Sequence, residues 1–186
     1  MKVNSNVIIY LPESFPQYIK DKVNDAGAEF IAVHKQIEIC KNVYSTGELG
    51  NYIKEQSLII NTSKGLVLIT GCAHYGIVKV IRKAKEISNR NFIENRQVIK
   101  EGNKINNNLN QKIMNGIYLV LGGFHLCNKN TSQIEKILEG VKKENVQKVA
   151  PSHCSGNLAR QLFKEKYKDN FLLIGVGRKI KVENSF

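Results

Sequence analysis

Three of the four histidines stand just past the end of a short apolar run. These runs lead into Gly71-Cys72-Ala73-His74, Gly122-Gly123-Phe124-His125 and Pro151-Ser152-His153-Cys154. Each run is typical of a buried strand, and each histidine is followed by a helical pattern. Because strand ends on one edge of an open α/β sheet converge on the same crevice, this repeated context predicts that three imidazoles meet there.

Three converging imidazoles suit zinc, iron or manganese, with a carboxylate or water completing the shell. The glycines before two of the histidines, Gly71, Gly122 and Gly123, allow the unusual backbone angles and close approach that a metal loop needs. A single histidine at a strand end is more often a hydrogen-bonded structural residue, but the threefold repetition of the context favours a metal. His34 lacks this context, and we interpret it as structural.

The remaining patterns predict a mixed α/β or α+β domain, with a strand-rich first half and alternating strands and helices in the second. We predict helices over 13–24, 76–87, 131–144 and 155–166, a hairpin over 57–70, and closing strands at 171–175 and 179–182. Residues 88–115 are rich in asparagine and lysine and have few apolar anchors, so we expect a flexible surface insertion there.

The chain has 186 residues, 28 Lys and Arg against 16 Asp and Glu, and a formal charge of +12. The basic residues are spread along the helices and resemble no nucleic-acid module, so we expect an anionic small molecule as ligand and no nucleic acid. No apolar run is long enough for a membrane span, and the N-terminus reads as a strand and not a signal peptide, so we expect a cytoplasmic protein.

The four cysteines form no CxxC pair, which argues against a structural zinc knuckle. Cys72, Cys127 and Cys154 lie near the histidines, and we interpret them as small residues that fill tight space. Glu55 precedes a predicted strand; a buried polar group near the site and a surface carboxylate are equally compatible with its position.

At these motifs the sequence resembles one subgroup of the metallo-β-lactamase superfamily, which includes the 7,8-dihydropterin-6-methyl-4-(β-D-ribofuranosyl)aminobenzene-5′-phosphate synthases of tetrahydromethanopterin biosynthesis. The resemblance rests on the ordered segments 46–49, 55–58, 71–74, 122–126, 151–156 and 174–177. It implies a four-layer αβ/βα sandwich with a metal pair, usually zinc, at one edge. It also implies His74 and His153 as metal ligands, and His125 as a ligand or substrate-facing residue. We add Gly122, Gly123 and Ser155 as candidate substrate-binding residues.

The superfamily's early H-x-H-x-D-H motif, which supplies ligands to both metals, is absent from the sequence. We therefore expect residues 1–186 to form a single partial domain, namely the C-terminal part of the sandwich in a truncated or split protein. Such a chain would bind zinc or another divalent metal only in part, would be a weak or inactive hydrolase alone, and would associate with an upstream chain or with itself. The alternatives are a non-catalytic binding or subunit protein whose basic surface holds an anionic ligand or nucleic acid, and a pseudogene product without function.

Overall fold

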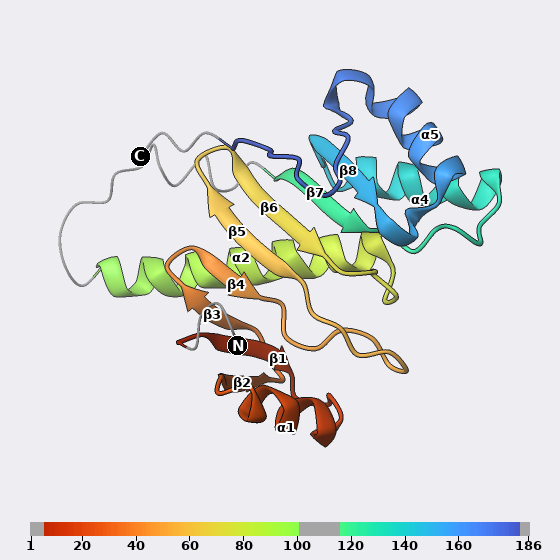
Figure 1. Cartoon of the computed structure of the whole chain (residues 1–186). Coiled ribbons are helices and arrows are strands. Elements are labelled where there is room, and N and C mark those ends of the chain that lie inside the picture. The colour runs from red at the N-terminus through yellow and green to blue at the C-terminus, as the bar shows by residue number, and fades with distance from the viewer. Residues whose placement is uncertain (1–5, 101–115, 183–186) are drawn as a thin grey trace.

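The structure is a computed structural model that describes residues 6–100 and 116–182, and of residues 90–100 it describes the backbone alone. The N-terminal part forms a small unit in which β1 (Ile8–Pro12) pairs in parallel with β2 (Glu29–Val33). The helix α1 (Gln17–Asp25) connects these two strands (Figure 1). Two hydrogen bonds link this unit to the segments beside the larger sheet: Gln56 Nε2 donates to the Tyr10 carbonyl at 2.8 Å, and the Ser14 amide donates to Glu48 Oε1 at 2.6 Å.

The second sheet has six strands in the order of the chain. They are β3 (Ile37–Cys40), β4 (Val43–Ser45), β5 (Leu58–Thr62), β6 (Gly65–Thr70), β7 (Ile117–Gly123) and β8 (Lys148–Ser152). Neighbours from β3 to β6 are antiparallel, whereas β6, β7 and β8 are parallel. The parallel half requires crossover connections, and helices supply them.

Three helices cover one face of this sheet: α2 (Ile77–Lys100), α4 (Thr131–Lys143) and α5 (Asn157–Tyr167), as Figure 1 shows. Their apolar stripes meet alternate residues of the strands, and the central side chains are fully buried. The cluster includes Leu68, Val80, Ile81, Val120, Ile134, Val149 and Phe163. The predicted mixed α/β class is therefore confirmed, and this core fixes the ends of β6, β7 and β8 relative to one another.

The opposite face of the sheet carries a smaller cluster around Val67, Leu119 and Ala150. The segment from Leu172 to Val182 packs against it without forming a strand. The prediction of closing strands at 171–175 and 179–182 was therefore wrong. Phe171 makes a parallel bridge to Val149, and the Leu172 amide donates to the Val149 carbonyl at 2.8 Å. The chain then turns between Gly175 and Arg178, and its apolar side chains pack on the face of the sheet.

The structure also corrects the start of the predicted insertion at 88–115. The helix α2 continues through residue 88 to Lys100, and residues 101–115 lie outside the described part of the chain. Residues 88–100 contain neither glycine nor proline, so nothing in this stretch breaks the helix. The asparagine cluster that suggested a loop begins only at Asn103. In the described part of the chain, no helix is long and apolar enough to cross a membrane.

Candidate metal centre

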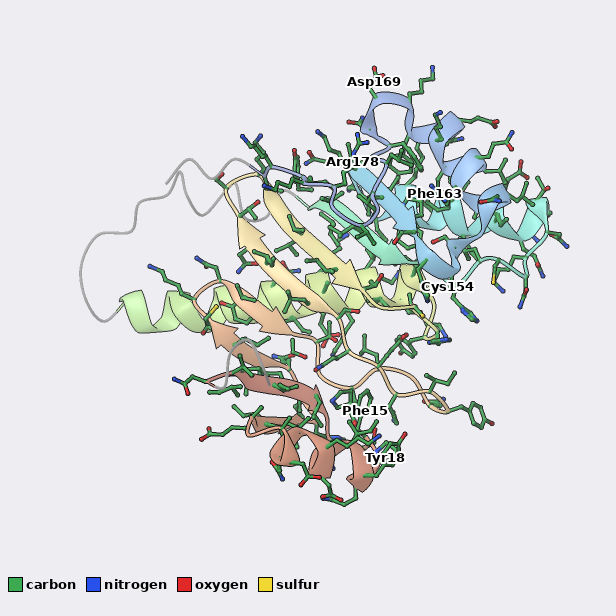
Figure 2. The ribbon with its side chains drawn as sticks, in the orientation of Figure 1. Phe15, Tyr18, Cys154, Phe163, Asp169 and Arg178 are labelled. Carbon is green, nitrogen blue, oxygen red and sulfur yellow. The ribbon has the colours of Figure 1, made fainter. Side chains whose placement is uncertain are left out.

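The three histidine loops lie side by side at one edge of the sheet. In the strand register, Thr70 of β6 pairs with Gly122 of β7, and Gly123 of β7 pairs with Ser152 of β8. The chain therefore leaves three neighbouring parallel strands at the same level. His74, His125 and His153 follow within a few residues, so all three loops lie at this edge, which Figure 2 marks at Cys154.

His74 is held by a carboxylate. Its Nδ1 lies 3.1 Å from Glu55 Oε2, and the backbone amide of Tyr75 donates to Glu55 Oε1, also at 3.1 Å. The side chains of His74 and Glu55 are 27% and 14% exposed. An ionised carboxylate only accepts hydrogen bonds, so Nδ1 carries the proton and the Nε2 lone pair of His74 stays free for a ligand. Glu55 is thus a site residue and not a surface carboxylate.

The ring of His125 rests against the ring of His74. The two centroids are 4.4 Å apart and the planes are inclined by 52°. Two imidazoles from neighbouring strand ends therefore stand together, as the sequence predicted for this pair.

His153 has different neighbours. Its ligand nitrogen and the sulfurs of Cys72 and Cys154 all lie within 4.8 Å of one another, and within the described residues no other three potential metal ligands group in this way. The Cys154 thiol also donates to the Cys72 carbonyl at 3.7 Å. Burial raises the pKa of the Cys72 thiol, and the neighbouring Cys154 and Glu55 raise it further. The structure therefore groups His74 with His125, and His153 with two cysteines, and does not gather the three imidazoles into one group as the sequence predicted.

Each histidine loop contains a residue other than glycine in the left-handed region. The φ angles are 54° at Ala73, 52° at His125 and 48° at His153. Such a conformation is unfavourable for residues with a Cβ atom and persists only where the surroundings enforce it. Strained backbone of this kind gathers at functional sites, but it is not confined to them here, since Asn42, Asn145 and Lys168 adopt it at turns and helix ends.

A hollow of about 280 Å³ opens beside the rings of His74 and His125. His74 and His125 form one side, and Lys79 and Lys129 also line it. The Lys79 ammonium lies 5.1 Å from the centroid of the Tyr75 ring. The hollow therefore combines two imidazoles and two lysines with a mainly apolar lining that includes Ile77, Phe124 and Leu126.

Among solved structures, the fold of this chain is similar to the crystal structure of Tm1679, described as a metal-dependent hydrolase of the β-lactamase superfamily. The two share a TM-score of 0.62 at 24% sequence identity, over 87% of this chain and 62% of that chain. This chain is a metallo-β-lactamase-fold protein. The fold class expected from the sequence resemblance is thereby confirmed.

Among curated sequences, this metallo-β-lactamase-fold chain is 32% identical over 133 residues to the 7,8-dihydropterin-6-methyl-4-(β-D-ribofuranosyl)-aminobenzene-5′-phosphate synthase of Methanocaldococcus jannaschii. It is 29% identical over 112 residues to an uncharacterized protein of the same organism. These matches cover 72% and 60% of this chain, but only 37% and 32% of the two relatives. No family model matches the sequence.

In this fold, the three residues that we proposed for substrate binding lie where the histidine loops pack together. Ser155 is fully buried; its hydroxyl accepts from the Phe124 amide at 3.1 Å and donates to the Ser152 carbonyl at 2.7 Å. Gly122 has a φ of 121°, and a Cβ there would collide with the Thr70 carbonyl. A Cβ on Gly123 would collide with the Gly71 carbonyl and lie 2.7 Å from Cys154 Sγ. These three residues bring the loops together, and the hydroxyl proton of Ser155 is already donated to the Ser152 carbonyl.

The sequence does not show which residue the Glu55 carboxylate contacts, because that contact depends on how residues 49–55 fold. Glu55 and Leu49 exchange two backbone hydrogen bonds, of 2.7 and 3.0 Å, which fold residues 49–55 back on themselves. Thr46 Oγ1 accepts from the Ser57 amide at 2.9 Å and fixes the base of this loop. The two motifs at 46–49 and 55–58 thus act together to aim one carboxylate at His74.

Proposed function

We propose that this chain supplies late histidine ligands to a metallo-β-lactamase-type metal centre, and that the assembled protein hydrolyses a phosphorylated or pterin-like small molecule. The observation that carries the proposal is the contact between His74 Nδ1 and Glu55 Oε2 at 3.1 Å. Histidines that bind metals almost always donate their other ring N–H to a carboxylate, a carbonyl or water. The residues present therefore fit a metal ligand at His74.

The donor set also fits in its chemistry. Imidazole suits zinc and several other divalent metals, and His125 lies in ring contact with His74. We assign His74 and His125 as the residues of this chain that would hold this metal, whereas His153, predicted as a third ligand, lies with Cys72 and Cys154. A divalent metal held there would polarise the scissile group and would lower the pKa of a bound water toward neutrality.

The chain's own residues have three tasks in this proposal. Glu55 fixes the tautomer and orientation of His74, and the bond from the Tyr75 amide fixes Glu55 itself. Lys79 and Lys129 line the hollow beside His74 and would bind the anionic part of the substrate. The likeness to a synthase named for a 5′-phosphate supports a phosphorylated substrate, although that name belongs to the relative.

We further propose that the remaining ligands come from another polypeptide segment, because the printed sequence has no H-x-H-x-D-H motif. The sheet face opposite the helices offers a place for such a segment. It carries a hollow of about 490 Å³, lined by apolar side chains that include Val67, Leu119, Leu121 and Ile180. The chain alone would then be a weak or inactive hydrolase.

Turnover of phosphate esters tests this proposal. The purified chain is assayed with zinc or manganese, alone and mixed with a polypeptide that carries an H-x-H-x-D-H segment. We expect turnover in the mixture, loss of it in His74→Ala, and retention in His34→Ala. His34 is a matched control, since its Nδ1 also contacts a carboxylate, Glu48, at 3.2 Å but lies in another loop. Equal turnover by the two variants would refute the role of His74.

The second candidate is a non-catalytic subunit that binds an anionic ligand with the same scaffold. The two lysines of the hollow and the net charge of +12 favour it. Such a protein would bind its ligand equally well after His74→Ala and would need no metal. Binding of inorganic phosphate by the wild type and this variant, with and without zinc, separates the two candidates.

A further inference from the structure

The group formed by Cys72, His153 and Cys154 has the composition of a metal site in its own right. Two sulfurs and one imidazole nitrogen lie within 4.8 Å of one another. They come from two loops, after β6 and after β8, that the sheet holds in place. We propose that these three residues form a thiolate–imidazole site for a soft or borderline metal such as Zn²⁺, separate from the pair formed by His74 and His125.

The spacing supports this assignment. In a tetrahedral site with Zn–S bonds of about 2.3 Å, two sulfurs stand roughly 3.8 Å apart. The donor atoms here, at most 4.8 Å apart, need to approach by no more than about 1 Å. Side-chain rotation provides this movement without any change in the sheet.

The backbone around the group is built for close approach. The Gly123 amide donates to the Gly71 carbonyl at 2.8 Å, and both the Leu126 and Cys127 amides donate to the Cys154 carbonyl at 3.2 Å. A Cβ on Gly123 would stand 2.7 Å from Cys154 Sγ and 3.1 Å from Cys72 Cα. The two cysteines therefore meet over a glycine, and the left-handed φ of 48° at His153 places that imidazole beside them.

The chemistry of the donors sets the metal class. Thiolates select zinc, copper(I) and iron–sulfur clusters over magnesium or calcium, which prefer oxygen ligands. Three protein ligands leave the fourth position of a tetrahedral metal open, as in catalytic zinc sites with two cysteines and one histidine. Cys72 and Cys154 are partly exposed and His153 is exposed, so solvent or a small ligand reaches that position.

This site does not depend on the proposed hydrolase, because His153 lies with Cys72 and Cys154 and the two sites have no ligand in common. The proposed hydrolase rests on His74 and Glu55. The group formed by Cys72, His153 and Cys154, called the sulfur site below, needs neither. The described residues provide a matched control for each donor type. Cys40 and Cys127 are exposed free cysteines outside the group, and His74 belongs to the other pair.

Cobalt(II) titration of the full chain under a phosphine reductant tests the site, because cobalt bound to thiolate gives a sulfur-to-metal charge-transfer band in the near ultraviolet. We expect the band in the wild type, in Cys40→Ser, in Cys127→Ser and in His74→Ala. Cys72→Ser and Cys154→Ser should each lose it. They should also bind cobalt at least about 10-fold more weakly, since losing even an outer-shell partner costs that much at metal sites.

A second measurement needs no variant and so does not depend on how the serine variants fold. The wild-type chain is alkylated with iodoacetamide with and without Zn²⁺, and each cysteine is followed by peptide mass analysis. We expect Zn²⁺ to protect Cys72 and Cys154 while Cys40 and Cys127 react at unchanged rates. Absence of the cobalt band in the wild type, its loss in His74→Ala, or equal alkylation with and without Zn²⁺ would overturn the proposal. Hydrolase failure in His74→Ala with the band retained would leave it standing.

Discussion

His74 Nδ1 and Glu55 Oε2 are 3.1 Å apart, although the two residues are separated by 19 positions and lie in different loops. The contact leaves one nitrogen of His74 free and directs it away from the carboxylate. Because Glu55 also accepts from the Tyr75 amide, its own position is fixed from two sides. The pair has the arrangement of a metal-binding histidine and its supporting carboxylate.

Replacing this carboxylate should weaken metal binding without unfolding the chain. Glu55→Gln keeps the shape but removes the charge that orients and polarises His74, so we expect the affinity of the histidine centre for zinc to fall by about 10- to 100-fold. Isothermal titration of the mixture with the completing polypeptide measures the change. Glu48→Gln is the control, since Glu48 supports His34 in the neighbouring loop. An equal loss in both variants would count against a specific role for Glu55.

Gly123 and Gly71 should respond very differently to the same substitution. A Cβ on Gly123 would meet the Gly71 carbonyl and Cys154 Sγ, whereas a Cβ on Gly71 would have no atom within 4 Å. We expect Gly123→Ala to lower the free energy of unfolding by about 1–3 kcal/mol, a usual cost of overpacking. Gly71→Ala should be nearly neutral. Urea denaturation decides, and comparable losses for the two variants would contradict the described packing of the loops.

Ser155→Ala distinguishes a structural role from the substrate role that the sequence suggested. Removing the hydroxyl leaves the buried Phe124 amide without its acceptor, which should cost about 1–3 kcal/mol of unfolding free energy. Ser132→Ala, at an exposed position of α4, should stay within about 0.5 kcal/mol of the wild type. A stable Ser155→Ala protein with impaired substrate binding would show that the hydroxyl faces the ligand after all.

Glu144 should make stability depend on pH. Its carboxylate accepts from Arg82 Nε at 2.6 Å and from Lys85 Nζ at 2.9 Å, which joins the end of α4 to α2. The hydrogen bond from Arg82 is the main cause that lowers the pKa of Glu144; burial opposes it and Lys85 adds to it. A lowered pKa in the folded state means that the stabilisation is present at neutral pH and is lost as the pH falls through that pKa.

We therefore expect Glu144→Gln to reduce the free energy of unfolding by about 1 kcal/mol at neutral pH, because the pair is partly exposed to solvent. The difference from the wild type should shrink as the pH falls below about 4. Denaturation at several pH values measures it, with Glu86→Gln on the outer face of α2 as control. A difference that grows toward acid pH would refute the assignment.

The sequence predicted the features that arise from local pattern. The apolar runs before His74 and His125 are strands, and the helices after them form because their apolar residues recur at helical spacing. These two facts suffice to place the histidine loops at one sheet edge. The sequence did not predict the extension of α2 beyond residue 87. Residues 88–100 contain asparagines, which are typical of loops, but the helix continues because this stretch has neither glycine nor proline.

Contacts between distant segments could not be predicted in this way. Cys72 and Cys154 are 82 positions apart, and only the strand register across β7 brings them together. Glu55 reaches His74 through the fold of the loop 49–55, which has no local signature. The segment after Phe171 has the composition of strands, yet it packs as an irregular chain because hydrophobic burial on the sheet face replaces backbone pairing.

The metal content of the purified chain tests the central claim most directly. Elemental analysis is performed on the chain alone and after mixing with a polypeptide that carries an H-x-H-x-D-H segment, for the wild type, His74→Ala and His34→Ala. Any metal held by Cys72, His153 and Cys154 is present in every sample. The increase in metal content on mixing therefore measures metal bound at the histidine centre. We predict an increase for the wild type and His34→Ala, and none for His74→Ala. No increase for the wild type, or the same increase in His74→Ala, would contradict a metal centre built on His74.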